Sequence, residues 1–159
     1  MIDRAVSIIE NIEYLTVASI CPDGTPWNTP VFTSYDSDLN FYWGSYKENQ
    51  HSLNILNNGL VFCVLYDSRA KEGTGEGLYL KGYAEQIDEL DQIEQGLLSL
   101  LKRSSHFGED TKKYIDDMPR RIFKFKPKEI WMNDGATKNG EYIDIRTKID
   151  LKTLKQQMN

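Results

Sequence analysis

The chain of 159 residues is 40% hydrophobic and 27% charged, and its formal net charge is -5. This length suits one domain, residues 1–159, with a single core, and the acidic balance argues against nucleic acid as the principal partner. The sequence shows neither an apolar run near twenty residues nor a signal-peptide pattern, so we expect a soluble, cytoplasmic protein that makes no contact with a membrane.

Cysteines and histidines are too few to suggest a metal centre. Cys21 and Cys63 lie far apart in the sequence, and the two histidines add no zinc-ligand spacing. We therefore expect two reduced thiols and no metal.

The first part of the chain predicts a helix and a hairpin. Residues 2–12 form an amphipathic pattern, with isoleucines and a valine on adjoining helical faces. Residues 14–20 are rich in β-branched and aromatic side chains, a Pro-Asp-Gly-Thr turn signature follows, and the strand pattern resumes over residues 27–35. Pro26 and Pro30 make this second strand irregular, because proline cannot donate a hydrogen bond to a ladder. An edge strand protected from aggregation is the other interpretation.

The stretch from Leu39 to Asn58 predicts a strand that leads directly into a helix. Aromatic residues recur at period two up to Tyr46, and helical spacing follows from Glu48 to about Asn57. The free N–H groups and the dipole of a helix N-terminus can hold an anion such as phosphate. The alternative is an ordinary capped helix beside a solvated lysine. Six side chains at this junction can donate hydrogen bonds: Ser45, Lys47, Asn49, Gln50, His51 and Ser52.

The second half of the chain alternates strands, loops and helices. The apolar run 60–66 predicts a strand covered on both faces, by the domain interior and by a helix or a partner subunit. The glycine-rich segment 67–77 predicts a mobile loop. It does not predict a phosphate loop, because it lacks a lysine-serine pair and a strand follows it. The remaining patterns predict strands at 78–86, 120–133 (broken at Pro127) and 142–149, helices at 88–103 and 110–118, a loop at 134–140, and a short terminal helix capped by Asp150.

Four segments together resemble one known family: YWGSYKENQHSLNI, TPWNTPVFTSYD before it, and LVFCVLYDS and GLYLKGYAEQ after it. In order and spacing they are similar to the FMN-binding split-barrel family typified by pyridoxamine 5'-phosphate oxidase, from about Tyr14 to Trp131. The resemblance implies a mainly β fold with flanking helices, built as a six-stranded antiparallel split β-barrel. It also implies a homodimer that holds FMN at its interface.

The resemblance further implies which residues hold the cofactor. Trp131 matches a tryptophan that lies near the flavin from the other subunit, and Glu76 and Gly77 are candidate neighbours of the ring. The backbone of the second strand is implied to lie against the isoalloxazine ring at Asn28, Thr29, Pro30 and Val31. The strand-to-helix stretch is implied to bind FMN through Trp43, Gly44, Ser45, Lys47, Asn49, Gln50, His51 and Ser52.

FMN would carry the redox chemistry, so we expect hydride transfer between a small organic substrate and the flavin, with no catalytic side chain assigned. Gln50 and His51 stand where the family enzyme has arginine and lysine, and the tail after Trp131 lacks the family's basic run, so vitamin B6 oxidation is not expected. The alternatives are a non-catalytic flavin-binding or redox-sensing module, and a deazaflavin- or haem-binding relative. Because this helix start is expected to be exposed, replacing Lys47 and His51 by alanine should loosen FMN without unfolding the domain.

Overall fold

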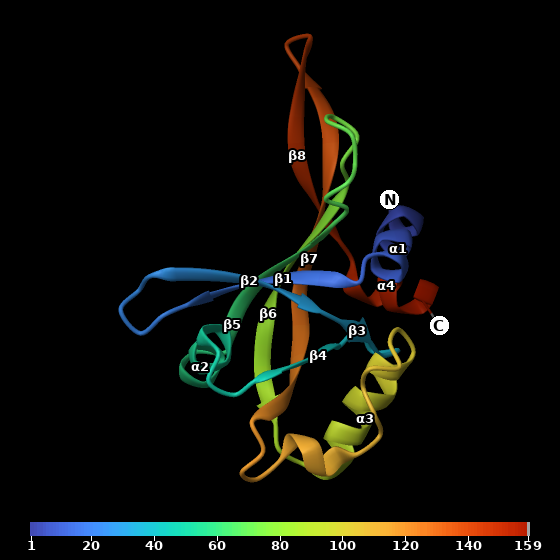
Figure 1. Cartoon of the computed structure of the whole chain (residues 1–159). Helices are drawn as coiled ribbons and strands as arrows, with labels where there is room; N and C mark the ends of the chain where they lie inside the picture. Colours follow the sequence, from blue (N-terminus) through green and yellow to red (C-terminus); the bar gives the residue numbers. More distant parts are fainter. Residues whose placement is uncertain (159) are drawn as a thin grey trace.

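Strands with one buried and one exposed face form an antiparallel sheet at the centre of the molecule (Figure 1). The computed structural model describes residues 1–158, and within them the sheet has eight strands in the order β2-β1-β5-β6-β7-β4-β3, with β8 paired to β7. The fold is therefore the expected mainly β split-barrel type, although its sheet is not closed and has two more strands than predicted. The strands are β1 (Tyr14–Ile20), β2 (Pro26–Phe32), β3 (Ser34–Tyr35), β4 (Phe41–Tyr46), β5 (Leu60–Tyr66), β6 (Gly77–Ile87), β7 (Arg120–Lys138) and β8 (Glu141–Ile149).

Helices pack on the sheet from several sides and join its ends. The N-terminal and C-terminal helices contact each other, the third helix lies against β3, β4 and β7, and the second helix contacts β1, β2 and β6. The α-helices are α1 (Ile2–Asn11), α2 (Gln50–Asn57), α3 (Leu90–Leu101) and α4 (Leu151–Met158). None of the helices within residues 1–158 is both long and apolar enough to cross a membrane.

The last helix begins as predicted, and the helical segment expected at 110–118 is mostly irregular. Asp150 caps α4, since its Oδ1 accepts hydrogen bonds from the backbone N–H of Thr153 at 2.8 Å and from its hydroxyl at 2.7 Å. Between α3 and β7 only a single 3-10 turn forms, η1 (Thr111–Tyr114). Tyr114 is the buried residue of this turn. One anchoring side chain is too little apolar surface to stabilise a longer helix.

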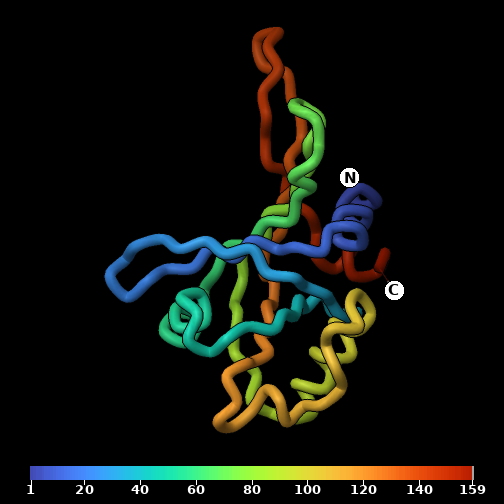
Figure 2. The backbone as a smooth tube through the Cα atoms, in the orientation of Figure 1, coloured from blue at the N-terminus to red at the C-terminus, as the bar shows by residue number. Residues whose placement is uncertain are grey.

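Two predictions about the C-terminal strands are wrong. Pro127 does not break β7, because it lies opposite Gly82 where the β6–β7 register shifts in a bulge, and a bulge tolerates a residue without an N–H. The loop expected at 134–140 is instead a continuation of the ladder. The chain turns only at Asn139 and Gly140, which both have positive φ, and so forms a long β7–β8 arm that projects from the body of the molecule (Figure 2).

The strand β4 is buried on both of its faces. Phe41 and Trp43 point into the main core, where the Trp43 ring stacks on the Phe123 ring with centroids 5.7 Å apart. Tyr42 points the other way, into a second core that α3 closes with Ile93 and Leu97. The helix therefore converts what would be a solvent face into interior.

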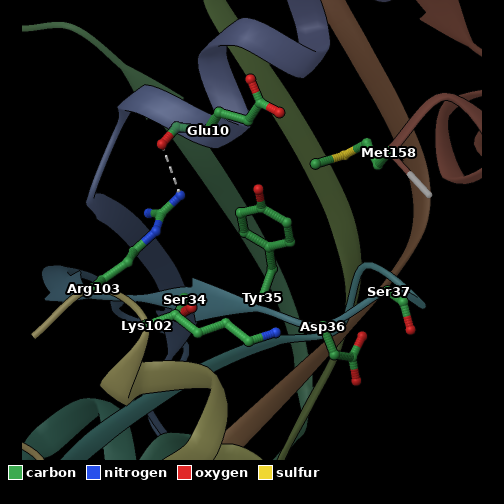
Figure 3. A pocket seen from close by; sticks show the side chains of 8 residues that line it. All are labelled: Glu10, Ser34, Tyr35, Asp36, Ser37, Lys102, Arg103 and Met158. Atoms are coloured by element: carbon green, nitrogen blue, oxygen red, sulfur yellow. Dashed lines mark hydrogen bonds between the residues drawn. The ribbon is translucent and has the colours of Figure 1, made fainter.

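Arg103 joins α1 to the sheet at the end of α3. Its guanidinium donates hydrogen bonds to the carbonyls of Ile12 at 2.8 Å, Thr33 at 3.2 Å and Ile9, so it caps the C-terminal end of α1. Burial lowers the pKa of this guanidinium from its ordinary value. A cavity of about 430 Å³ lies beside it, and Figure 3 shows the Arg103 side chain reaching up from α3 towards the carbonyl of Glu10. Because the Arg103 guanidinium already donates its hydrogen bonds to backbone carbonyls, we assign Arg103 a structural role.

Replacing Arg103 by leucine should lower the free energy of unfolding by about 2 kcal/mol, because buried carbonyls lose charged hydrogen-bond donors. Urea denaturation of both proteins measures the difference. Lys102→Leu is the control, since the neighbouring Lys102 side chain is exposed. Equal losses in the two variants would show that the carbonyl contacts add no stability.

Candidate functional site

The start of α2 is an uncapped helix N-terminus that directly follows β4. Its first intrahelical hydrogen bond runs from the N–H of Leu53 to the carbonyl of Asn49 at 3.0 Å, and no side chain caps it. The N–H groups of Gln50, His51 and Ser52 therefore have no acceptor within the helix. Such a terminus favours an anion through both its N–H groups and its dipole.

The polar side chains around this terminus bond to neighbours rather than to its N–H groups. Asn49 Nδ2 donates to Ser45 Oγ at 3.0 Å, and the Ser52 hydroxyl donates to the carbonyl of Tyr46 at 2.7 Å. Gln50 Nε2 donates to Asn54 Oδ1 at 2.8 Å, and Asn54 in turn donates to Ser19, which ties the helix to β1. No side chain caps the helix, so the alternative of an ordinary capped helix is wrong.

Among the predicted donors, Lys47 is the one with a full charge at the terminus. Its backbone N–H donates to the carbonyl of Pro119 at 2.9 Å, which fixes the turn between β4 and α2, and its side chain is half-buried. Arg120 adds a second cation at this corner, with its guanidinium 5.4 Å from the centre of the Tyr46 ring. Both charges would favour a phosphate here.

Three of the predicted site residues are more buried than the sequence suggested. Trp43 is 0% exposed and Ser52 is 0% exposed, so their side chains offer no surface to a cofactor. His51 is 4% exposed and lies against Phe123, and burial lowers the pKa of its imidazole. The expectation that the start of α2 is exposed is therefore wrong at His51. Replacing His51 by alanine would open a cavity in the core.

The strand register aligns two of the four second-strand candidates, Asn28 and Pro30, with Trp131 on one surface, whereas Thr29 and Val31 point to the opposite side, where Val31 is buried in the main core. Directly paired residues of neighbouring antiparallel strands point to the same side. We call this surface the outer sheet face. One row across it contains Pro30, Thr16, Val64, Tyr79 and Trp131, and the next contains Asn28, Ala18, Phe62 and Lys81.

Aromatic and aliphatic side chains of the outer sheet face are open to solvent in a single chain. Phe62 is 40% exposed, Tyr83 is 55% exposed, and Leu60 and Tyr66 are exposed beside them. Phe62 also stacks on Trp131, with ring centroids 6.4 Å apart. The apolar run 60–66 was predicted to be covered on both faces, and the chain itself covers only one of them.

Pro30 and Trp131 lie on strands that are not neighbours in the sheet. Their strands, β2 and β7, have β1, β5 and β6 between them. Contact of both residues with one flavin ring stays a prediction.

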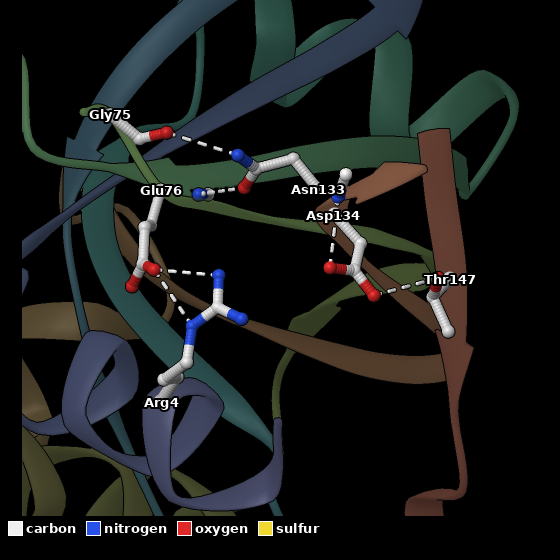
Figure 4. Close-up of polar contacts among 8 residues, drawn as sticks. Arg4, Gly75, Glu76, Asn133, Asp134 and Thr147 are labelled. Carbon is white, nitrogen blue, oxygen red and sulfur yellow. Dashed lines mark hydrogen bonds and ion pairs between the residues drawn. The ribbon is translucent and has the colours of Figure 1, made fainter. Parts of the chain in front are cut away.

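The loop between β5 and β6 is tied down at its end. The Asn133 side chain accepts a hydrogen bond from the N–H of Gly77 at 2.6 Å and donates to the carbonyl of Gly75 at 3.0 Å, and Arg4 of α1 pairs with Glu76 at 2.6 Å (Figure 4). The Glu76 carboxylate is therefore directed towards α1 and engaged there. Its expected place beside a flavin ring stays a prediction.

Cations stack on aromatic rings at the base of the β7–β8 arm, and the sequence analysis did not predict these contacts. The Arg146 guanidinium lies 4.5 Å from the centre of the Tyr79 ring and 2.7 Å from the Asp144 carboxylate. Lys148 lies over Trp131 at 5.7 Å. Such pairs depend on the β7–β8 and β6–β7 registers. The sequence analysis predicted a loop at 134–140 and gave no register for these strands.

Comparison with known proteins gives a family and a fold. The sequence model described as Pyridoxamine 5'-phosphate oxidase matches residues 1–134. No curated protein matches the chain. Among solved structures, the fold is similar to a heme binding protein from Mycobacterium smegmatis, with a TM-score of 0.70 and 14% identity over 98% of this chain. This chain spans 60% of the length of that protein.

Two further structures share the fold over most of their own length. An F420 reductase aligns with a TM-score of 0.57 and 22% identity, over 78% of this chain and 93% of its own. The heme storage protein HutZ from Vibrio cholerae aligns with a TM-score of 0.64 and 12% identity, over 80% of this chain and 91% of its own. At sequence identities this low, the similarity shows a shared fold alone.

Proposed function

The chain belongs to the pyridoxamine 5'-phosphate oxidase family, and from this we propose that it is a flavoprotein that binds FMN between two copies of itself. The observation that carries the proposal is the uncapped α2 N-terminus beside Lys47. A flavin without a phosphate would leave the free N–H groups of α2 and the charge of Lys47 without an anion to bind. FMN supplies an anion of the right kind, because phosphate oxygens accept hydrogen bonds and carry negative charge.

The residues at the terminus fit a phosphate. The N–H groups of Gln50, His51 and Ser52 would donate to its oxygens, and Lys47 would add charge. The backbone of Asn28 and the residues after it would face the ring, since α2 contacts β2. In this arrangement the ring is held by backbone and the phosphate by a helix start.

The second copy would cover the outer sheet face. An exposed aromatic patch of this kind on one chain indicates an interaction surface. Burying Phe62 and Tyr83 against the partner would bring Trp131 of one copy towards the ring held by the other, since Phe62 stacks on Trp131. The proposed assembly is therefore a homodimer with two flavin sites.

FMN supplies hydride transfer when it is bound, and the protein's part is to bind and orient the ring and a small-molecule substrate. We propose that the protein is an oxidoreductase. The two histidines differ in burial, since the His51 side chain is buried and the His106 side chain is exposed on the loop after α3. We assign neither a proton-transfer role.

A haem or deazaflavin cofactor is the competing possibility, because proteins of similar fold are named for heme and for F420. Haem would need an axial ligand, and the buried His51 leaves His106 for that role. The absorbance spectrum of freshly purified protein separates the three cofactors. Flavin bands support the proposal, and a haem Soret band would replace it.

Lys47→Ala should weaken FMN binding about tenfold, because one charged contact to the phosphate is lost. Quenching of FMN fluorescence during titration of cofactor-free protein measures the affinity. Lys128→Ala is the control, since Lys128 is exposed on β7. The single Lys47 variant replaces the double variant with His51, because alanine at the buried His51 would also destabilise the core. Unchanged affinity in Lys47→Ala would contradict the assignment of the phosphate to α2.

A further inference from the structure

The strand β8 is an edge of the sheet without the usual protection against pairing with another chain. Within residues 1–158, three strands pair on one side only: β2, β3 and β8. The strand β2 contains Pro26 and Pro30, and β3 has two residues. The strand β8 has nine residues and no proline, and its ladder to β7 runs without a register shift. Proline, short length and bulges are common ways to keep an edge strand from pairing, and β8 uses none of them.

The β7–β8 arm places this edge in the open. Figure 1 shows the arm extending from the body of the molecule beyond α1 and α4. Near its tip, Tyr142 is 75% exposed and Ile143 is 36% exposed. In an antiparallel pair, every second residue turns its N–H and C=O away from the neighbouring strand. The outer edge of β8 therefore presents backbone donors and acceptors with which a further strand can pair.

The side chains of β8 fit a second copy of the same strand. Let two β8 strands lie antiparallel, with Ile145 of one opposite Ile145 of the other. Asp144 of each copy then lies opposite Arg146 of the other, so this charge pair forms twice. On the other face, Ile143 lies opposite Thr147. Opposite charges and β-branched side chains that face each other directly across two strands both stabilise the pairing.

The charges favour this register over the two neighbouring symmetric ones. A pairing centred on Asp144 would oppose two carboxylates, and one centred on Arg146 would oppose two guanidinium groups; like charges in these positions are destabilising. In the single chain, Arg146 Nη1 lies 2.7 Å from the Asp144 carboxylate of the same strand. Exchanging this exposed ion pair for two between copies adds little energy. The charges therefore select the register, and the backbone hydrogen bonds supply most of the affinity.

We infer that β8 is a self-association surface, which pairs antiparallel with β8 of a second copy of this chain around Ile145. This edge is a different surface from the outer sheet face, so the contact goes beyond the proposed flavin-binding dimer and would join two such dimers. One strand pairing buries little surface compared with a stable interface, so we expect a dissociation constant on the order of 100 µM. At concentrations of about 1 µM this contact is open, and the outer-face dimer can be measured separately.

Amide NMR spectra of the unmodified protein test the contact through a dilution series from about tenfold above to about tenfold below that constant. We expect the amide signals of residues 141–149 to shift together along one association curve, while those of η1 stay constant. Signals of β8 that do not change with concentration would overturn the inference, and this edge would then be open to a strand of a different protein. The measurement uses no FMN, so absent flavin binding would refute the proposed function and leave this result unaffected.

Two charge reversals separate a contact between copies from a role within the arm. In Asp144→Arg and in Arg146→Asp, both opposed positions carry like charges, so each variant alone should associate at least about tenfold more weakly. A mixture of the two variants again opposes positive and negative charges at both positions, and the β8 signals should shift on mixing. A disturbance inside one arm cannot be repaired by another chain.

Lys113→Asp is the control for these variants, because it reverses an exposed charge on η1, away from β8. Its association should match that of the unmodified protein. Variants that associate as well alone as the unmodified chain, or that fail to associate when mixed, would contradict the pairing around Ile145. If a variant does not fold, the dilution series of the unmodified protein still decides whether β8 self-associates.

Discussion

Phe62→Lys should dissociate the dimer and, with it, remove most of the flavin binding. Phe62 lies at the centre of the outer sheet face, where it stacks on Trp131 and is 40% exposed in one chain. Losing a central aromatic side chain from an interface costs about 2–4 kcal/mol, so the dimer dissociation constant should rise about 100-fold. Sedimentation at several protein concentrations measures this constant, and FMN titration of the same samples measures cofactor binding.

Leu98→Lys is the matched control for this experiment. Leu98 is 50% exposed on α3. Its substitution also exchanges an exposed apolar side chain for lysine, but at a position away from the outer sheet face. It should leave both the dimer and FMN binding unchanged. A Phe62→Lys protein that stays dimeric would show that two copies meet through another surface. A monomer that still binds FMN tightly would show that the site is complete in one chain.

Gly82→Ala should destabilise the fold by about 3 kcal/mol, because the sheet leaves no room for a methyl group at this position. An added Cβ would lie 2.2 Å from the carbonyl oxygen of Lys126 and 2.9 Å from Cα of Pro127. These are backbone atoms of the neighbouring strand, at the bulge where Pro127 meets β6, so they cannot rotate away. Chemical denaturation monitored by tryptophan fluorescence gives the free energy of unfolding.

Gly108→Ala is the comparison for this substitution. An added Cβ at Gly108 meets no atom within 4 Å, and its loop lies outside the sheet. Its stability should change by less than about 0.5 kcal/mol. If Gly82→Ala were equally harmless, β6 and β7 could not lie as close together at the bulge beside Pro127 as described.

Local sequence signals predicted the elements whose causes are local. The alternation before Tyr46 and the helical spacing after it predicted the β4–α2 junction, and Asp150 predicted the cap of α4. The apolar run 60–66 also predicted the strand β5, although the chain itself covers only one of its faces. These features follow from residue type and period within a few positions of the chain.

The errors arose where distant segments decide the outcome. Pro127 looked like a strand break because the sequence does not reveal the glycine that lies opposite it. The family resemblance assigned Trp43 to the cofactor site, but α3 and the core bury both faces of β4. The expected exposure of His51 was wrong because this side chain of α2 packs against Phe123 of β7. Residues 134–140 of the β7–β8 arm were predicted as a loop because polar, glycine-containing strands carry little apolar pattern.

Binding of a flavin phosphate by the N-terminus of α2 is tested most directly by a paired titration of cofactor-free protein with FMN and with riboflavin. The two ligands share the same ring and differ in the phosphate. We predict saturable FMN binding with one flavin per chain, and riboflavin binding at least about 100-fold weaker, because several hydrogen bonds and a charge contact are lost. Equal affinity for the two flavins, or no binding of either, would contradict the account.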